Sequence, residues 1–377
     1  MEVKDEIISW FLRNILIPRM EIIDKPAFII CKVSGQRGKT NLRELFVPER
    51  LYSMLETEIV NSDKKQGRST LYTAGKKFGF IYSGLSNFPN VKRYTMKDTV
   101  NFIYYFTRYM EATYARKITY KIDSKKLIYK MFMDNYVICR FSGIGHLLSD
   151  GGSAGVWSYM MCDPNIEAIK PKCQGRGDKN CEVIAAPYEI LDRMGYKPLR
   201  CTGLETLKLD NKYLEINKIR PSAYAVNSLK KLIDTGFFKY DHGQITYKDE
   251  RFFLCEASFM YIVEKELKKT KNGLDILWSC SFDFGKRLAE IAGGQDPAKF
   301  IMDFFPALGF GDILVKRAPW KVLVNFFPWT KWADDVDFVM FRGILSGFIS
   351  GLTSKNIELK KIKKYVSENG FSLMIEE

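Results

Sequence analysis

The chain has 377 residues, of which 46% are hydrophobic and 27% are charged, as is typical of a globular protein with about two domains. No apolar run reaches the roughly 18 uncharged residues that a membrane-spanning helix needs. The net charge of +14 comes mostly from dispersed lysines, without a helix-turn-helix, zinc-finger or RNA-recognition signature.

Charge and cysteine content also bear on partner and compartment. The lysine clusters at residues 267–273 and 359–365 are typical of solvated faces, although an acidic partner, a membrane surface or nucleic acid are alternatives. We expect no nucleic-acid partner. Residues 1–14 carry acidic side chains and no signal-peptide hydrophobic region, and the eight cysteines form no short disulfide framework. We therefore expect a cytoplasmic protein.

The periodicity of apolar residues predicts the elements of the first half of the chain. In order, it predicts an amphipathic helix over 7–16, a β-rich stretch over 20–38, helices over 51–59 and 71–82, strands within 115–122 and 127–141, a glycine-punctuated helix from Gly143, and a last strand over 181–186.

The second half predicts a similar order after a linker over 191–221. It contains helical spacing from Ala225 to Ile233, a β-rich stretch over 236–247, helices over 259–267 and 277–288, strands over 311–317 and 321–327, a helix from Gly343, and a last strand over 371–376.

Particular residues repeat between the halves. Lys65, Gly67, Leu71, Tyr72, Phe78 and Gly79 match Lys271, Gly273, Leu277, Trp278, Phe284 and Gly285 at an offset of 206, Phe141-Ser142-Gly143 matches Phe341-Arg342-Gly343 at 200, and Asn165-Ile166-Glu167 matches Asn356-Ile357-Glu358 at 191. A repeat of this length predicts two α+β (mixed α/β) domains, over 1–190 and 222–377.

The helices over 71–82 and 277–288 carry small residues on one face. Gly75 and Gly79 in the first, and Ser281 and Gly285 in the second, lie four residues apart. Glycine inside a helix costs about 1 kcal/mol relative to alanine, so something must pack closely against this face. That neighbour is either another helix or a ligand in a groove.

Residues 172–183, KCQGRGDKNCEV, place two cysteines around a glycine-containing turn before a final strand. This string resembles the closing signature of the 4-vinyl-reductase-like (4VR, hydrocarbon-binding) domain family. Residues 71–79 and 141–155 resemble the family's two small-residue helices. The resemblance covers residues 1–190, and 222–377 as a degenerate second copy.

The resemblance implies a fold similar to that of TRAPP vesicle-tethering subunits and a domain that binds small lipophilic molecules. Such domains sense aromatic compounds in transcription activators and occur in bacteriochlorophyll biosynthesis, and they commonly pair. We therefore expect two TRAPP-subunit-like domains packed as an internal pseudo-dimer, in a monomer or a homodimer.

The resemblance also implies a zinc site in some members, formed by cysteines at the positions of Cys173 and Cys181, a Glu and an upstream Cys. Here the Glu position is Lys170, and the upstream position falls near Leu147. Because an ammonium is a poor ligand, substitutes are needed for four-coordinate zinc. The candidates are Cys162, Asp150, Glu167, Asp178 and His146. Two free thiols or a redox-linked pair are the alternatives. The second copy, with Lys364 and Ser372 at the matching places, is expected to be metal-free.

Several catalytic motifs are missing. Only two histidines occur, and there is no GxGxxG after a strand, Walker loop or G-x-S-x-G elbow. We expect no independent catalytic activity. Two aromatic-rich stretches, over 102–109 and 300–341, suit a core, a domain interface or a ligand pocket.

The function that we predict is binding or sensing of a small hydrophobic or aromatic ligand, with a signal to a protein partner. Tyr105, His146 and Trp157 would orient the ligand. The alternatives are a reductase or tetrapyrrole-pathway accessory subunit, and a TRAPP-like scaffold without a ligand.

Overall fold

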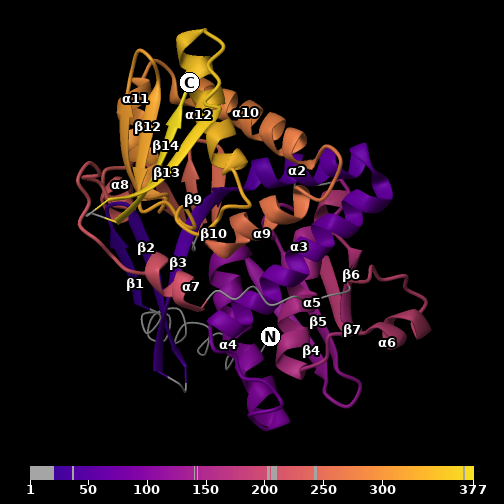
Figure 1. Ribbon diagram of the computed structural model, residues 1–377. Coiled ribbons are helices and arrows are strands. Elements are labelled where there is room, and N and C mark those ends of the chain that lie inside the picture. Colours follow the sequence, from indigo (N-terminus) through magenta and orange to yellow (C-terminus); the bar gives the residue numbers. More distant parts are fainter. Residues whose placement is uncertain are drawn as a thin grey trace.

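A computed structural model describes residues 21–35, 38–139, 141, 143–201, 204, 210–241, 244–367 and 370–377. The predicted helix over 7–16 lies outside these residues. The fold is α+β, with helices packed on antiparallel sheets, as predicted (Figure 1). Within the described ranges, no helix combines the length and the apolar character that crossing a bilayer requires.

We call residues 21–193 the first half. Its elements are β1 (Glu21–Lys25), β2 (Phe28–Gly35), β3 (Gly38–Pro48), α2 (Glu49–Ser62), α3 (Lys64–Leu85), α4 (Met96–Tyr114), β4 (Lys117–Asp123), β5 (Ile128–Asp134), α5 (Leu147–Met161), β6 (Ile166–Lys172), the 3-10 turn η3 (Gln174–Arg176), β7 (Cys181–Pro187) and α6 (Tyr188–Arg193).

We call residues 229–376 the second half, which follows α7 (Asp210–Ile216). Its elements are α8 (Leu229–Asp234), β8 (Lys239–Asp241), β9 (Gln244–Tyr247), β10 (Glu250–Glu256), α9 (Ser258–Leu267), α10 (Gly273–Ala292), α11 (Pro297–Ala307), β11 (Asp312–Lys316), β12 (Lys321–Asn325), α12 (Val339–Thr353), β13 (Lys361–Ser367) and β14 (Gly370–Glu376).

Apart from η3, α6 and α8, the two halves have the same order of elements: three strands, three helices, two strands, one helix and two strands. Each half also contains a four-stranded sheet of the same form, β4-β5-β7-β6 in the first and β11-β12-β14-β13 in the second. A duplicated domain predicts this order. The internal pseudo-dimer stays a prediction.

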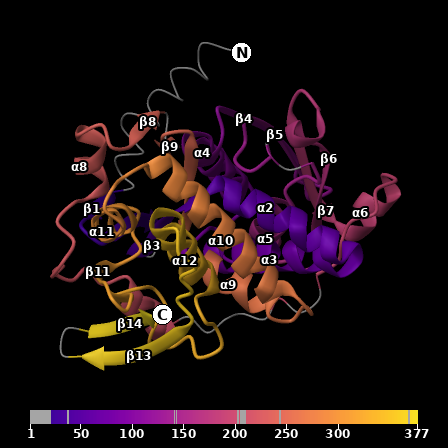
Figure 2. The same ribbon diagram turned by 90° about the horizontal axis from the view of Figure 1, so that it is seen from above.

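The two halves share one six-stranded sheet, β1-β2-β3-β10-β9-β8, in which β3 of the first half pairs with β10 of the second. Glu44 lies opposite Glu256 in this antiparallel pair, and Phe252 lies opposite Pro48. The four-stranded sheets lie toward opposite ends of the molecule (Figures 1 and 2). The halves are therefore joined through continuous backbone hydrogen bonding.

In each half, two small-residue helices cross in close contact, α3 with α5 and α10 with α12. A Cβ atom on Gly79 would lie 2.2 Å from the carbonyl oxygen of Gly152, and one on Gly285 would lie 2.2 Å from that of Ile344. Of the two alternatives for the small-residue face, helix packing is therefore the one observed.

Three predicted helix starts were wrong, two of them at the glycine-punctuated helices. The helix expected from Gly143 begins at Leu147, and Gly343 lies inside α12; the match of Phe141-Ser142-Gly143 with Phe341-Arg342-Gly343 does not hold, and Ser142 is outside the described residues. Instead Gly151 packs on Tyr72, and Gly343 on the matching Trp278.

The helix expected from Ala225 begins at Leu229. The carboxylate of Asp312 accepts hydrogen bonds from the backbone N–H groups of Ala223, Tyr224 and Ala225, so these residues form a turn around Asp312. Ser228 then caps the shorter helix.

Candidate functional site

A cavity of about 110 Å3 lies inside the first half, between α3, α4, β5 and α5. Its wall is mostly aromatic and aliphatic, and consists of Phe78, Gly79, Tyr82, Ile103, Phe106, Tyr109, Met110, Tyr114, Tyr129, Met131, Tyr136, Val137, His146, Leu148, Ser149, Gly152, Ser153, Val156, Trp157, Phe253, Cys255 and Phe259. An apolar cavity of about 150 Å3 in another protein binds benzene, so this space suits a molecule of about one ring.

The second half closes the cavity. Phe253 and Cys255 come from β10 and Phe259 from α9, and the ring of Phe259 lies 5.0 Å from that of Phe78 on α3. Both halves of the chain therefore contribute to the wall of the cavity.

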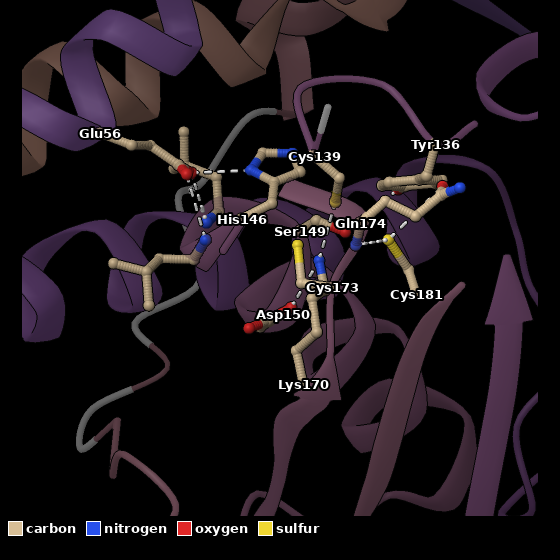
Figure 3. Close-up of polar contacts among 12 residues, drawn as sticks. Glu56, Tyr136, Cys139, His146, Ser149, Asp150, Lys170, Cys173, Gln174 and Cys181 are labelled. Atoms are coloured by element: carbon tan, nitrogen blue, oxygen red, sulfur yellow. Dashed lines mark hydrogen bonds and ion pairs between the residues drawn. The ribbon is translucent and has the colours of Figure 1, made fainter. Parts of the chain in front are cut away.

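His146 lines the cavity just before α5, and α2 fixes its orientation (Figure 3). Its Nδ1 lies 2.8 Å from Oε1 of the buried Glu56. The same carboxylate accepts the backbone N–H groups of Leu147 and Leu148, the first two residues of α5. A carboxylate at a helix N-terminus satisfies donors that lack intrahelical partners. Glu56 thus fixes both the start of α5 and the orientation of the His146 imidazole.

Trp157 also lines the cavity, as part of the α5 wall. Its Nε1–H donates to the carbonyl oxygen of Leu127 at 2.7 Å, and its ring lies 5.5 Å from that of Tyr129. Its polar atom is therefore already occupied, and the indole contributes an apolar surface.

The tyrosines of the wall are neutral. Burial raises the pKa of Tyr82, Tyr109 and Tyr114 well above the ordinary value, and it raises the pKa of Tyr136 to about 12 although Ser149 acts in the opposite direction. The hydroxyl of Tyr136 accepts a hydrogen bond from Ser149 Oγ at 3.1 Å.

The structure places Tyr105 outside the cavity, with 52% of its surface exposed. Phe106, Tyr109 and Met110 of the same helix line the wall instead. Because one residue turns a helix by about 100°, Tyr105 faces away from this stripe. His146 and Trp157, in contrast, come together at the cavity.

Among the described residues, three buried thiols gather beside the cavity, with their sulfur atoms all within 4.8 Å of one another. Cys173 and Cys181 flank the turn between β6 and β7, and Cys139 follows the cavity residues Tyr136 and Val137 (Figure 3). The other two thiols stabilise the thiolate of Cys173 and lower its pKa. Sequence reasoning missed Cys139.

Lys170 is the cation of this region. Its side chain is 1% exposed, and its Nζ lies 3.0 Å from Oδ1 of Asp150 and 3.4 Å from Sγ of Cys139. Burial favours the neutral amine, but Asp150 and the neighbouring thiols outweigh it and raise the pKa of Lys170. The residue therefore carries its charge inside the protein.

The donor set lacks the fourth protein ligand of a closed zinc site, because Lys170, whose Nζ lies 3.4 Å from Cys139 Sγ, is an ammonium without a lone pair. Among the described residues, none of the predicted substitutes joins the thiols. Asp150 pairs with Lys170, Glu167 binds Lys76 and Tyr72, Asp178 accepts from the backbone of Cys173, His146 binds Glu56, and Cys162 lies at the far end of α5.

The second half has a smaller cavity of about 30 Å3. Phe327 stacks on Phe341 at 4.9 Å, and Tyr261 stacks on Trp329 at 5.0 Å, so aromatic rings occupy most of this region. Of the alternatives for residues 300–341, a packed core is the one observed. In the first half, Phe106 and Tyr109 belong to the larger cavity.

No family model matches the chain, and no curated protein matches it significantly. Among solved structures, the chain is similar to the phenol-responsive sensory domain of the transcription activator PoxR, crystallised with phenol, at 14% identity and a TM-score of 0.32. The match covers 44% of this chain and 92% of that domain. A similarity at this level supports no argument about fold or function.

Proposed function

We propose that the protein binds a small, uncharged, apolar or aromatic molecule in the cavity of the first half. The observation that carries the proposal is the apolar cavity of about 110 Å3, walled by aromatic rings from both halves. Desolvating an apolar molecule in such a space is favourable, whereas an unpaired charge would be strongly disfavoured there.

The binding signal would pass to the second half and from there to a protein partner. Phe253 and Cys255 belong to β10, which pairs directly with β3 of the first half. A ligand that contacts them shifts the equilibrium between arrangements of the two halves if it binds one of them better. In this proposal, the second-half residues that complete the cavity wall transmit the binding signal.

We also propose that the chain consists of two tandem 4VR-like domains packed as an internal pseudo-dimer. The shared order of elements and the matching four-stranded sheets support it. All eight cysteines are free thiols, which favours a reducing compartment such as the cytoplasm. A cavity for about one ring argues against a tetrapyrrole, whose macrocycle contains four.

The test is thermal denaturation and calorimetry of the full chain with phenol, toluene, indole and a long-chain fatty acid. We expect the single-ring compounds to raise the melting temperature, and the fatty acid to have no effect. At a free ligand concentration about 100 times Kd, the stabilisation should be about 2.7 kcal/mol.

The control is Val156→Phe, which adds a ring to the wall of this cavity. It should fold and lose the response to every single-ring compound. If the ligands stabilised Val156→Phe as much as the wild type, the binding site would lie outside this cavity. If no compound raised the melting temperature of the wild type, the proposal would be contradicted.

A further inference from the structure

The three-thiol cluster of Cys139, Cys173 and Cys181 already contains a buried cation. The Nζ of Lys170 lies 3.4 Å from Cys139 Sγ and is held by Asp150 at 3.0 Å. We infer that the Lys170 ammonium, and not a metal ion, is the cation that holds this cluster together.

Ligand chemistry favours this assignment. An ammonium carries no lone pair, so Lys170 cannot supply the fourth protein ligand that a closed structural zinc site needs beside three thiols. The carboxylate nearest to Lys170, that of Asp150, lies 3.0 Å from its Nζ and is therefore engaged by the ammonium.

Hydrogen bonds hold the turn between Cys173 and Cys181 without a metal. Gln174 accepts the backbone N–H of Asn135 at 2.8 Å and donates to Asp134 Oδ1 at 3.1 Å. The backbone N–H of Cys173 donates to Asp178 Oδ2 at 2.8 Å. The turn is thus fastened to the end of β5, just before the cavity residue Tyr136.

The second half contains a lysine in a similar place, and among the described residues no cluster of three thiols lies beside it. Lys364 lies on β13, the edge strand that corresponds to β6 in sheet order, and its Nζ donates to the carbonyl oxygens of Ala333 and Val336, in the segment before α12. Lys170 likewise reaches from β6 to Cys139, in the segment before α5. Each half thus has a lysine that binds the segment before its second small-residue helix, whereas the three-thiol cluster belongs to the first half.

The experiment compares the wild-type full chain with Lys170→Glu, which replaces the ammonium with an oxygen ligand. Each protein is produced with zinc, dialysed, and analysed for metal by mass spectrometry. We expect well below one zinc ion per wild-type chain and about one per Lys170→Glu chain. Cobalt should give thiolate charge-transfer absorbance with Lys170→Glu alone, and a chelator should lower the melting temperature of that variant alone.

The matched control is Lys172→Glu, which makes the same charge change on the same strand, at a side chain that is 62% exposed. It should remain as zinc-poor as the wild type. If Lys170→Glu does not fold, Lys170→His supplies a neutral nitrogen ligand and should gain zinc in its place. One zinc per wild-type chain, or no gain of zinc in a folded Lys170→Glu or Lys170→His, would overturn the inference.

Discussion

The first and second halves share a framework and differ in what fills it. In both, a glutamate from the helix that follows the strands of the six-stranded sheet accepts backbone N–H groups at or just before the start of the second small-residue helix: Glu56 for α5, and Glu264 for α12 through Asp337 and Val339. The residue before that helix is His146 in the first half and Phe338 in the second. Beside this residue the first half has a cavity of about 110 Å3, whereas the second half has one of about 30 Å3 among stacked rings.

This difference separates residues that build the fold from residues available for a ligand. The carboxylate caps and the close helix crossings occur in both halves, so they are explained by structure alone. The cavity of about 110 Å3 and, among the described residues, the three-thiol cluster belong to the first half. A functional role is therefore best sought in the features that the halves do not share.

The shared helix crossings give the largest expected effect. Gly79→Val and Gly285→Val each force a Cβ within 2.2 Å of a backbone carbonyl oxygen, where neither helix can yield locally. We expect each to lose more than about 4 kcal/mol of the free energy of unfolding, measured by urea denaturation.

Gly84→Ala is the control for this prediction, because its Cβ would lie 3.5 Å from the Tyr159 ring. It should stay within about 1 kcal/mol of the wild type, since alanine favours helix. If the second half tolerated Gly285→Val while the first did not tolerate Gly79→Val, the two crossings would not be equivalent.

The pairing of β3 with β10, where the two halves join, predicts that the free energy of unfolding depends on pH. Burial raises the pKa of Glu256 from its ordinary value of 4.5 to about 7, and burial together with Glu256 raises the pKa of Glu44 opposite it. The folded state therefore binds more protons than the unfolded state between these values, so stability should fall as pH rises from about 4.5 to about 7. At 1.36 kcal/mol per pH unit, Glu256 contributes about 3 kcal/mol to this loss.

Urea denaturation of the wild type and Glu256→Gln between pH 5 and 8 measures this contribution. Because other titrating groups are common to both proteins, the difference between the curves isolates the junction. The wild type should lose stability more steeply than the variant. Parallel curves would show that Glu256 ionises as readily in the folded chain as in the unfolded one.

Local elements were the predictable part of the fold. The alternation of Tyr129, Met131 and Met133 indicates a strand with one buried face, and β5 has this pattern. The helical spacing of Leu51, Leu55 and Ile59 likewise predicted α2. The pairing of β3 with β10 was not predictable, because cross-strand partners some 200 residues apart leave no local periodicity.

Part of the candidate site follows from local sequence. Of the three predicted ligand contacts, the structure places His146 and Trp157 in the cavity wall and Tyr105 outside it, and their role in binding stays a prediction. Helical phase indicates the position of Tyr105, because Phe102, Phe106, Tyr109 and Met110 form the i, i+4, i+7, i+8 stripe of α4. Cys139 carried no signal, because a loop with positive φ at Asn135 and Ile138 brings it to the other thiols. Such loop geometry depends on tertiary contacts.

The difference in cavity size predicts unequal tolerance of an added ring. Val156→Phe enters a space of about 110 Å3, whereas Val263→Phe enters one of about 30 Å3. Overpacking costs about 1–3 kcal/mol, and filling a cavity commonly stabilises by about 0.5–2 kcal/mol. We expect Val263→Phe to be about 2 kcal/mol less stable than Val156→Phe in urea denaturation. Equal stability of the two variants would mean that the second half accommodates an added ring as easily as the first.

The smallest expected difference concerns the helix caps. Asp63 accepts hydrogen bonds from the backbone N–H groups of Lys65 and Gln66 at the start of α3, whereas in the described chain Asn272 makes no side-chain cap for α10. Asp63→Ala should therefore cost about 1 kcal/mol, and Asn272→Ala less than about 0.5 kcal/mol. Amide hydrogen exchange should show increased fraying of the first turn of α3 in Asp63→Ala, with α10 unchanged. An equal cost in both variants would mean that Asn272 caps its helix in solution, and that the two halves resemble one another here more closely than their side chains indicate.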